Sequence, residues 1–461
     1  MTWAMELQFD GKIFISLALI GLIGLLIRLN DALVVKPERL RSMLRKQGIS
    51  GPPPTLLLGN IREIRKAQST ILKAPTTELP VSHNCAALLF PFFEKWRKQY
   101  GKVFLFSLGN TQISFVNQPE VVREITTCTS LDLGKPSYQQ KERGPLLGQG
   151  ILTSNGAVWA YQRKILSPEL YMEKGMMNLI TQSTIMLNSW KSRIEAEGGT
   201  ADIKIDEFMR RFSGEVISRA CFGSNYSKGE EIFLKLRALQ QLVLEGAKSS
   251  DLSPEATDRF ITDNCKNIYL AGYETTAVAA TWCLMLLASN LEWQQRVRAE
   301  VLDICAGGIP DADMLRRMKQ LTMVINESLR LYPPVAVVSR ESFKDMKFGD
   351  INVPKGVNLW TLVLTLHTDP DIWGADADRF NPERFGNGIT GAYKLPHLYM
   401  PFGVGPRVCL GQNLAMVELK ILISLILSNF SFSLSPNYRH APALRLVIEP
   451  EHGVALLVRK L

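Results

Sequence analysis

The segment that most constrains this chain lies near its C-terminal end, where residues 401–411 read PFGVGPRVCLG. A single cysteine, Cys409, stands there among three glycines, two prolines and an arginine. A phosphate-binding loop needs glycines in the order G-x-G-x-x-G. Here Gly403 and Gly405 fill the first two glycine positions, but Val408 stands where the third glycine is required. The pattern disfavours a nucleotide site. A tight loop around a small thiol is then the simplest interpretation, because most free cysteines are buried.

A second interpretation gives this loop a chemical role, because it runs into an apolar helix expected from about Gly411 to Leu427. Backbone N–H groups at a helix N-terminus stabilise a thiolate, lower its pKa and make it a competent metal ligand. Gly405 and Gly411 would let the backbone lie flat against a large planar cofactor, and Arg407 would offer a forked cation to a carboxylate. A haem bound through Cys409 requires these properties.

The loop is similar to the haem-thiolate loop of the cytochromes P450, whose positions are filled here by Phe402, Gly405, Arg407, Cys409 and Gly411. The similarity extends over essentially the whole chain. It implies the cytochrome P450 fold, mainly α with a small β-rich part. It also implies haem b with the Cys409 thiolate as the axial iron ligand and the other four residues at the cofactor.

The remaining sequence pattern is mostly helical. Residues 263–288 are apolar nearly all round, which predicts a helix through the middle of a core. Residues 289–292, S-N-L-E, are expected to cap the next helix. Short β-type runs lie within residues 103–116, where Gly109-Asn110 is expected to turn a hairpin.

The predicted central helix contains the sequence AGYETT at residues 271–276. A threonine in such a helix usually bonds to the carbonyl of the preceding turn, and a buried glutamate is costly without a partner. A surface position for Glu274 on a kinked helix is therefore the simpler interpretation. The P450 resemblance instead implies that Glu274 and Thr275 lie over the haem and deliver protons during oxygen activation.

One acidic and two basic residues belong to a predicted structural network. Glu327 and Arg330 in E-S-L-R share one helix face through their i, i+3 spacing. Such pairs are commonly exposed and contribute less than about 1 kcal/mol, but this helix is otherwise apolar and ends at residues 333–334, Pro-Pro. Burial is therefore expected. By resemblance, Arg384 in NPERF is the third member of a Glu-Arg-Arg network with a structural role.

Partners for the haem carboxylates are also implied by the resemblance. Trp159 and Arg163 in WAYQR match a P450 helix, and one turn brings both to the same face. Arg340 follows a proline-rich turn, where P450s often place another such donor. Single Trp-Arg spacings are frequent by chance, so these residues carry less information than the cysteine loop.

The N-terminal region predicts a membrane anchor. Residues 13–27 are uncharged and flanked by Lys12 and Arg28. They cover only about 22 Å of a hydrocarbon core of roughly 30 Å, a gap that snorkelling of the two flanking cations would close. A cleaved signal peptide is the alternative, but two acidic residues precede the first lysine. Six basic against two acidic residues within 28–46 predict a cytosolic body.

These patterns divide the chain into an anchor at 1–30, a basic stretch and proline hinge at 31–54, and a catalytic domain at 55–461. Seven scattered cysteines without a C-x-x-C pair argue against a disulfide framework and a structural zinc site. The net charge of +9 has no dominant basic block with interleaved aromatic residues, so nucleic acid is not expected as a partner.

One interval departs from the family pattern. Trp159 and Thr275 stand only 116 positions apart, whereas a full-length P450 uses several dozen more residues there. The lid region around 225–260, which roofs the substrate cavity in P450s, is therefore predicted to be shortened. A transcript that joins near residues 240–244 is one explanation.

Three functions follow as hypotheses. The first is a monooxygenase that inserts one oxygen atom into an apolar small molecule, with electrons from NADPH-cytochrome P450 reductase. Its resemblance to plant microsomal P450s places it in the endoplasmic reticulum membrane as a single-pass protein and points to gibberellin-type diterpenoids. The second is a haem-thiolate isomerase acting on a peroxide, which would not need Glu274 and Thr275. The third is a truncated product that binds haem but is catalytically impaired.

Overall fold

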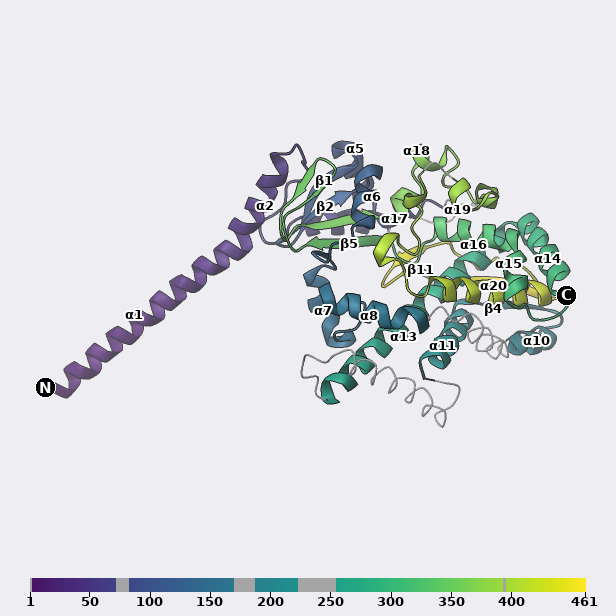
Figure 1. Ribbon diagram of the computed structural model, residues 1–461, viewed down its shortest axis with the longest axis horizontal. Helices are drawn as coiled ribbons and strands as arrows, with labels where there is room; N and C mark the ends of the chain where they lie inside the picture. The colour runs from purple at the N-terminus through teal and green to yellow at the C-terminus, as the bar shows by residue number, and fades with distance from the viewer. Residues whose placement is uncertain (1, 72–82, 170–186, 223–253, 393–394) are drawn as a thin grey trace.

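The computed structural model describes residues 2–71, 83–169, 187–222, 254–392 and 395–461. A folded body dominated by helices carries small sheets in more than one part, with β1, β2 and β5 near the anchor and β4 toward the opposite end, and the helix α1 (Thr2–Asn30) projects away from the body (Figure 1). The predicted architecture, mainly α with a small β-rich part, is confirmed. Most of the shortened region around 225–260 lies outside the described residues.

The body contains helices along its whole length. They are α2 (Lys36–Arg45), α3 (Ile61–Ile71), α4 (Cys85–Leu89), α5 (Pro91–Tyr100), α6 (Pro119–Thr127), α7 (Ser137–Leu147), α8 (Gly156–Glu169), α10 (Leu187–Ala196), α11 (Asp206–Phe222), α13 (Pro254–Ser289), α14 (Leu291–Cys305), α15 (Ala312–Arg317), α16 (Lys319–Leu331), α17 (Val363–His367), α18 (Pro370–Trp373), α19 (Gly388–Gly391) and α20 (Gln412–Asn429). A π-helical turn, η1 (Asp31–Val35), joins α1 to α2, and 3-10 turns lie at η3 (Pro382–Phe385), η4 (Pro396–Leu398) and η5 (Gly405–Arg407).

Within the residues that the structure describes, the strands form four small sheets. They are β1 (Val103–Leu108), β2 (Thr111–Val116), β3 (Leu133–Gly134), β4 (Thr200–Lys204), β5 (Val337–Ser342), β6 (Met346–Phe348), β7 (Ile351–Val353), β8 (Asn358–Leu362), β9 (Phe430–Leu434), β10 (Pro442–Leu444), β11 (Ile448–Pro450) and β12 (Ala455–Lys460). The largest has the order β1-β2-β8-β5-β3, and a second joins β4, β12 and β9. The predicted hairpin is confirmed, because β1 and β2 pair antiparallel around Gly109, whose φ is +60°.

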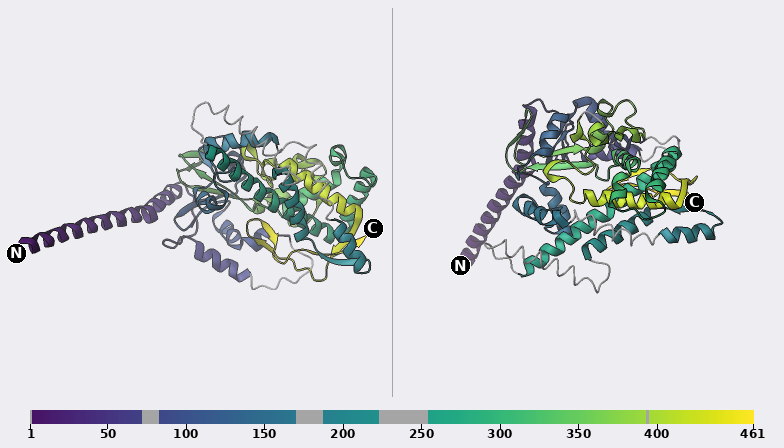
Figure 2. Two further views of the ribbon diagram at one scale, coloured as in Figure 1. Left: turned by 90° about the horizontal axis from the view of Figure 1, so that it is seen from below. Right: turned by 45° about the vertical axis from the view of Figure 1, so that its right-hand side comes forward.

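The helix α13 forms the centre of the core, as its apolar sequence predicts. Residues 277–288 are buried, including the large indole of Trp282. The helices α11, α16 and α20 pack around it, and α20 runs beside it in Figure 2. The expected cap of the next helix is wrong: Asn290 is the N-cap of α14 and makes no side-chain cap bond. The Ser289 hydroxyl instead donates to the Met285 carbonyl, 3.0 Å away.

The segment predicted to be a hinge packs onto the body before the proline run begins. Leu44 is fully buried, and the backbone N–H of Leu105 donates to the Ser50 carbonyl at 2.9 Å. A Cβ at Gly51 would lie 1.8 Å from the Leu105 carbonyl oxygen, so only glycine fits there. In the described structure, close packing therefore starts within α2 rather than at residue 55.

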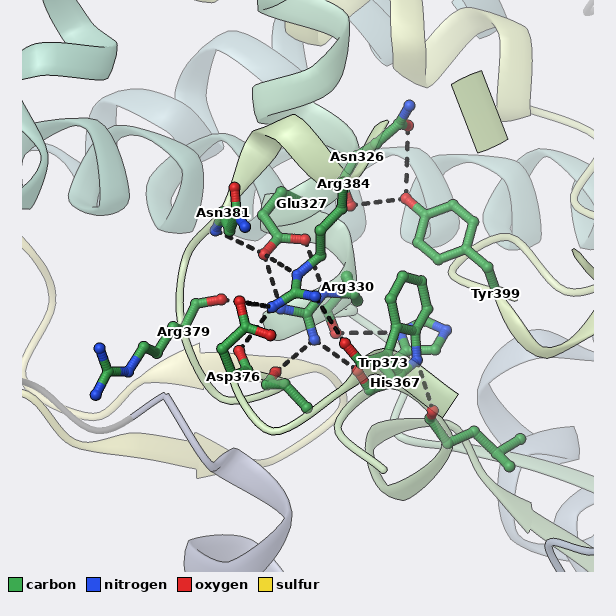
Figure 3. A network of polar contacts seen from close by, with 12 residues as sticks. Asn326, Glu327, Arg330, His367, Trp373, Asp376, Arg379, Asn381, Arg384 and Tyr399 are labelled. Carbon is green, nitrogen blue, oxygen red and sulfur yellow. Dashed lines mark hydrogen bonds and ion pairs between the residues drawn. The ribbon is translucent and has the colours of Figure 1, made fainter. Parts of the chain in front are cut away.

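The predicted Glu-Arg-Arg network lies in the interior (Figure 3). Glu327 and Arg330 are fully buried, as expected, and their side chains form two parallel bonds of 2.7 Å each. The guanidinium of Arg330 also donates to the carbonyls of His367 and Ala377. Arg384 Nε lies 3.6 Å from the Glu327 carboxylate. The network thus ties α16 to the irregular segment that follows α17.

Glu327→Ala is expected to lower the free energy of unfolding by about 3–5 kcal/mol, because it leaves the Arg330 charge buried without its partner. Urea denaturation followed by circular dichroism measures this. The matched control is Glu195→Ala, which removes an exposed pair with Lys460 and should cost less than about 1 kcal/mol. Equal losses in the two variants would contradict the structural role of the network.

Candidate functional site

The loop 402–411 is held in one shape by backbone bonds. The Cys409 N–H donates to the Phe402 carbonyl at 2.8 Å, and the Val408 N–H donates to the Gly405 carbonyl at 3.0 Å. Gly405 has a φ of +74°, a conformation that glycine adopts without strain. Gly411 is the N-cap of α20, so the predicted position of the cysteine, just before a helix, is confirmed.

Cys409 is accessible at the surface of the protein, and yet enough protein surrounds it for burial to raise the pKa of its thiol. The backbone N–H of Gly411 and the charge of Arg163 act in the opposite direction. The expected lowering of the pKa is therefore wrong for the protein alone, because these two contributions do not outweigh burial.

The two glycines expected to face a planar cofactor have different surroundings. A Cβ at Gly405 would lie 2.3 Å from the Thr126 carbonyl oxygen, so this glycine is required for the loop to pack against α6. A Cβ at Gly411 would meet no atom within 4 Å. The prediction expected open space beside both Gly405 and Gly411. The structure has such space only beside Gly411.

Three cations lie beside the indole of Trp159, and a fourth lies close to them. The guanidinium of Arg407 lies 4.0 Å from the ring centroid, that of Arg163 lies 5.9 Å away, and the ammonium of Lys135 lies 5.7 Å away. Arg340 belongs to the same group, since its charge acts on Lys135. The structure therefore brings together all the predicted carboxylate partners, and it places Arg163 close enough to Cys409 to influence the thiol.

The cations of the cluster are half-buried, and together they carry excess positive charge. Burial, followed by the charges of Arg407, Arg340 and Arg163, lowers the pKa of Lys135 to about 7. Burial and Arg407 lower the pKa of Arg340 to about 10. Mutual repulsion and desolvation both penalise such an arrangement unless an anion binds to it.

Backbone carbonyls supply the hydrogen bonds that three of these cations make. Lys135 donates to Ile151 and Ser154, Arg407 donates to Leu133, and Arg340 donates to the carbonyl of Ser339. Arg407 Nη1 is buried and has no hydrogen-bond partner. Across the described ranges, Lys135, Arg340 and Arg407 form no ion pair with a carboxylate.

These residues fit a haem. The accessible Cys409 thiol provides one ligand, and the cation cluster provides donors for two carboxylates. The buried, unsatisfied Arg407 Nη1 is the clearest sign of a missing acceptor, because buried guanidinium groups are normally hydrogen-bonded. Cys409 would bind the iron, while Arg407, Arg340, Arg163 and Lys135 would hold the propionates beside Trp159.

Glu274 and Thr275 lie on α13, both partly buried. The Thr275 hydroxyl donates to the Ala271 carbonyl at 2.7 Å, the local bond that is usual for a threonine in a helix. A Glu274 carboxylate oxygen lies 3.6 Å from Arg210 Nε on α11. Glu274 therefore has a charged partner and does not pay the cost of an unpaired buried carboxylate. It lies between α13 and α11 rather than on an open surface.

Sequence reasoning missed three participants. Lys135 joins the cation cluster and Arg210 pairs with Glu274, and nothing in their local spacing indicates either role. Glu418 is fully buried on α20, one of its oxygens has no hydrogen-bond partner, and burial raises its pKa to about 8 despite a bond from Thr276. A single acidic residue in the apolar run 411–427 was the available signal.

Comparisons with known proteins agree with the geometry. Residues 81–249 and 234–456 match the family model described as Cytochrome P450. Cytochrome P450 714C2 of Oryza sativa subsp. japonica is 49% identical over 491 aligned positions, which cover 93% of this chain and 94% of the relative. Cytochrome P450 714B2 of the same plant is 43% identical, with 99% of this chain and 98% of the relative covered. Cytochrome P450 714A2 of Arabidopsis thaliana is 40% identical, with 96% and 97% covered.

The pKa of Lys135 predicts a pH dependence for the cofactor-free protein. Between about pH 7 and about pH 10, the unfolded chain holds a proton on this lysine that the folded chain lacks. The free energy of unfolding should therefore fall as the pH decreases from about 10 to about 7, and this contribution should level off below that range.

Lys135→Met should remove this contribution, which urea denaturation at several pH values would measure. The control is Lys347→Met, an exposed lysine on β6, which should keep the wild-type slope. The same pH slope in wild type and in Lys135→Met would contradict the interpretation of the cluster.

Proposed function

Since the chain belongs to the cytochrome P450 family, whose members are haem-thiolate monooxygenases, we propose that it inserts one oxygen atom from O2 into an apolar small molecule. NADPH-cytochrome P450 reductase would supply the electrons. The plant relatives described above share its family, and the resemblance of its sequence to gibberellin-oxidising enzymes supports a gibberellin-type diterpenoid as the substrate. The haem, when bound, supplies the oxygen chemistry.

The observation that carries this proposal is one thiol beside Arg163, close to a group of cations in which Lys135, Arg340 and Arg407 form no ion pair with a carboxylate in the described ranges. Cys409 is assigned as the axial ligand, because it stands at the end of the backbone-bonded loop and beside Arg163. Arg407, Arg340, Arg163 and Trp159, with Lys135 added from the structure, are assigned to the carboxylates. Phe402, Gly405 and Gly411 shape the loop that presents the sulfur.

Glu274 and Thr275 are proposed to move protons. The Thr275 hydroxyl now donates to Ala271, and a rotation about χ1 would release that bond and free the hydroxyl for a proton transfer. Glu274 is held by Arg210 at 3.6 Å, a distance that allows exchange of the ion pair for another donor. This pair favours a monooxygenase over an isomerase acting on a peroxide, which would not need proton delivery.

A catalytically impaired product is the second candidate. The alignment with Cytochrome P450 714C2 has 491 positions and is longer than the whole chain of 461 residues, so that relative has residues absent here. The family model matches in two segments that overlap at residues 234–249, inside the region where the sequence predicts a shortened lid. Both observations support a deletion in that region.

The proposed location is the endoplasmic reticulum membrane. The helical segment Phe14–Arg45, near the N-terminus, contains an 18-residue stretch that is strongly apolar and has no buried residue. Such exposure is unfavourable in water and is expected of a helix surrounded by lipid. The excess of basic residues after the span supports a cytosolic body.

Cys409→Ala is expected to abolish the thiolate-type Soret band of the reduced, carbon monoxide-treated protein, because the iron loses its sulfur ligand. Absorption spectroscopy of purified protein measures this. Cys128→Ala is the control, since Cys128 is another partly exposed free cysteine. Retention of the band in Cys409→Ala would exclude this residue as the ligand.

Thr275→Ala should keep the haem spectrum but divert reducing equivalents from product to hydrogen peroxide. The measurement compares NADPH consumption, product and peroxide in the reconstituted system. Thr281→Ala is a matched control, because Thr281 makes the same bond to the preceding turn, at 2.9 Å, deeper in the same helix. Unchanged coupling in Thr275→Ala, or equal uncoupling in both variants, would count against the role.

Replacing residues 225–260 with the corresponding lid of a full-length relative should increase haem occupancy and coupling. A shortened lid leaves apolar surface in water at a cost of about 25 cal/mol per Å², and it admits water to the reaction site. Haem content per protein and product per NADPH are the measurements. Equal values for the two chains would show that the short interval is compensated.

A further inference from the structure

A cluster of two phenols, two imidazoles and one thiol lies in the core beside α13. The Tyr332 side chain is fully buried at the end of α16, and its hydroxyl lies 2.6 Å from His83 Nδ1 and 3.3 Å from His440 Nε2. The Tyr438 hydroxyl lies 2.8 Å from His440 Nδ1. The Cys85 thiol is fully buried and also bonds to Tyr332. The proposed reaction uses none of these groups.

Each tyrosine of the cluster can donate its proton to a neutral imidazole. Burial lowers the pKa of both histidines to about 4, so each ring has one N–H and one acceptor nitrogen. The shorter of the two Tyr332 contacts assigns His83 Nδ1 as its acceptor. Tyr438 donates to His440 Nδ1, and the His440 N–H then lies on Nε2 and faces the Tyr332 oxygen. A directed chain of hydrogen bonds therefore runs from Tyr438 to His83.

The indole of Trp282 stacks on the phenol ring of Tyr332. The ring centroids are 4.2 Å apart and the planes differ by 14°. Trp282 is fully buried on α13, and its Nε1–H donates to the Ile448 carbonyl at 2.8 Å. Thr275 stands seven positions earlier on this helix, so two turns separate the side chains by about 10 Å on one face. The stacked pair thus begins two turns from the proposed site of proton delivery.

This arrangement suits one-electron oxidation of Tyr332. Indole and phenol rings lose an electron more readily than aliphatic or amide groups. A phenol that has lost an electron is a strong acid, so a base within hydrogen-bond distance is needed to accept its proton. His83 is that base, and a pKa of about 4 is sufficient for so strong an acid. Tyr399 is also buried, but it donates to the Asn326 carbonyl at 2.8 Å, and an amide oxygen is a much weaker base.

We propose that Trp282, Tyr332 and Tyr438 form an aromatic path that carries an oxidising equivalent away from the haem site when peroxide reacts there without substrate. The inference rests on the proposed function and adds a protective redox activity to it. Trp282 gives one electron to the strong oxidant formed from peroxide. Tyr332 then returns one electron to the indole, and its proton moves to His83 Nδ1. These steps leave neutral Trp282, a neutral Tyr332 radical and protonated His83.

The aromatic path ends near the surface. One electron from Tyr438 reduces the Tyr332 radical, the proton on His83 returns to the Tyr332 oxygen, and the Tyr438 proton passes to His440 Nδ1. Tyr438 and His440 are only half-buried, so a small soluble reductant such as ascorbate can give Tyr438 one electron while His440 returns its proton. Each passage therefore consumes one electron from the reductant and leaves every residue of the path unchanged.

Freeze-quench electron paramagnetic resonance of the haem-loaded full chain tests this. Ferric protein in detergent is mixed with peracetic acid, without substrate or ascorbate, and frozen within milliseconds. Wild type should give a tyrosyl radical signal that narrows when ring-deuterated tyrosine is incorporated, and Tyr332→Phe should lose most of it. Tyr399→Phe is the matched control and should keep the signal, because its hydroxyl lacks a basic acceptor.

Two further variants test the separate steps. His83→Gln keeps a hydrogen-bonding side chain but removes the base, so it should also lose most of the signal. Trp282→Phe keeps a stacked ring that is hard to oxidise, and it tests the same path if Tyr332→Phe does not fold. Ascorbate should raise the number of peracetic acid equivalents that wild type survives before its Soret band bleaches. It should not do so in Tyr332→Phe.

The outcomes separate this inference from the proposed function. A wild-type chain that binds no haem would overturn both. A haem-loaded chain without a tyrosyl signal, or with equal signals in wild type, Tyr332→Phe and Trp282→Phe, would overturn the aromatic path alone. A wild-type signal in His83→Gln would exclude proton transfer to that residue.

Discussion

The bond between Glu327 and Arg330 is the interaction on which the cysteine loop depends. Arg330 reaches from α16 to the His367 carbonyl, and the His367 Nε2 in turn accepts the backbone N–H of Met400 at 3.0 Å. Burial and the nearby Arg330 charge lower the pKa of His367 to about 3, so its ring is neutral and its Nε2 is available as an acceptor. One buried ion pair thus holds the residue directly before the loop that carries Cys409.

The cation cluster has the opposite character, because it is incomplete without a ligand. Arg330 is hydrogen-bonded to the carboxylate of Glu327. In the cation cluster, by contrast, Arg407 keeps a buried N–H without an acceptor, and the pKa of Lys135 is lowered. Binding of a dianion would restore the charges and the missing bonds together. The stability of the body and the occupancy of its cofactor site are therefore linked through these side chains.

Much of the fold and part of the site could be predicted because their signals are local. The Gly109 turn, the burial of Glu327 with Arg330 and the helix after Cys409 all follow from spacings of a few residues. Lys135 could not be found in this way, since its partners Arg163 and Arg407 are brought to it only by the tertiary fold. The pKa of the Cys409 thiol was missed for a related reason, because burial is a property of the whole molecule and outweighs the helix N-terminus.

The three-stranded sheet β4-β12-β9 sets an order of events during synthesis. Its central strand, β12, follows every other described element along the chain, and it pairs with β4, more than 250 residues earlier. The apolar helix α1 leaves the ribosome first, and domains complete their folding only when all their strands have been made. In the proposed membrane-anchored protein, α1 would enter the bilayer while β4 still lacks its partner, so the body would acquire its final packing next to the membrane.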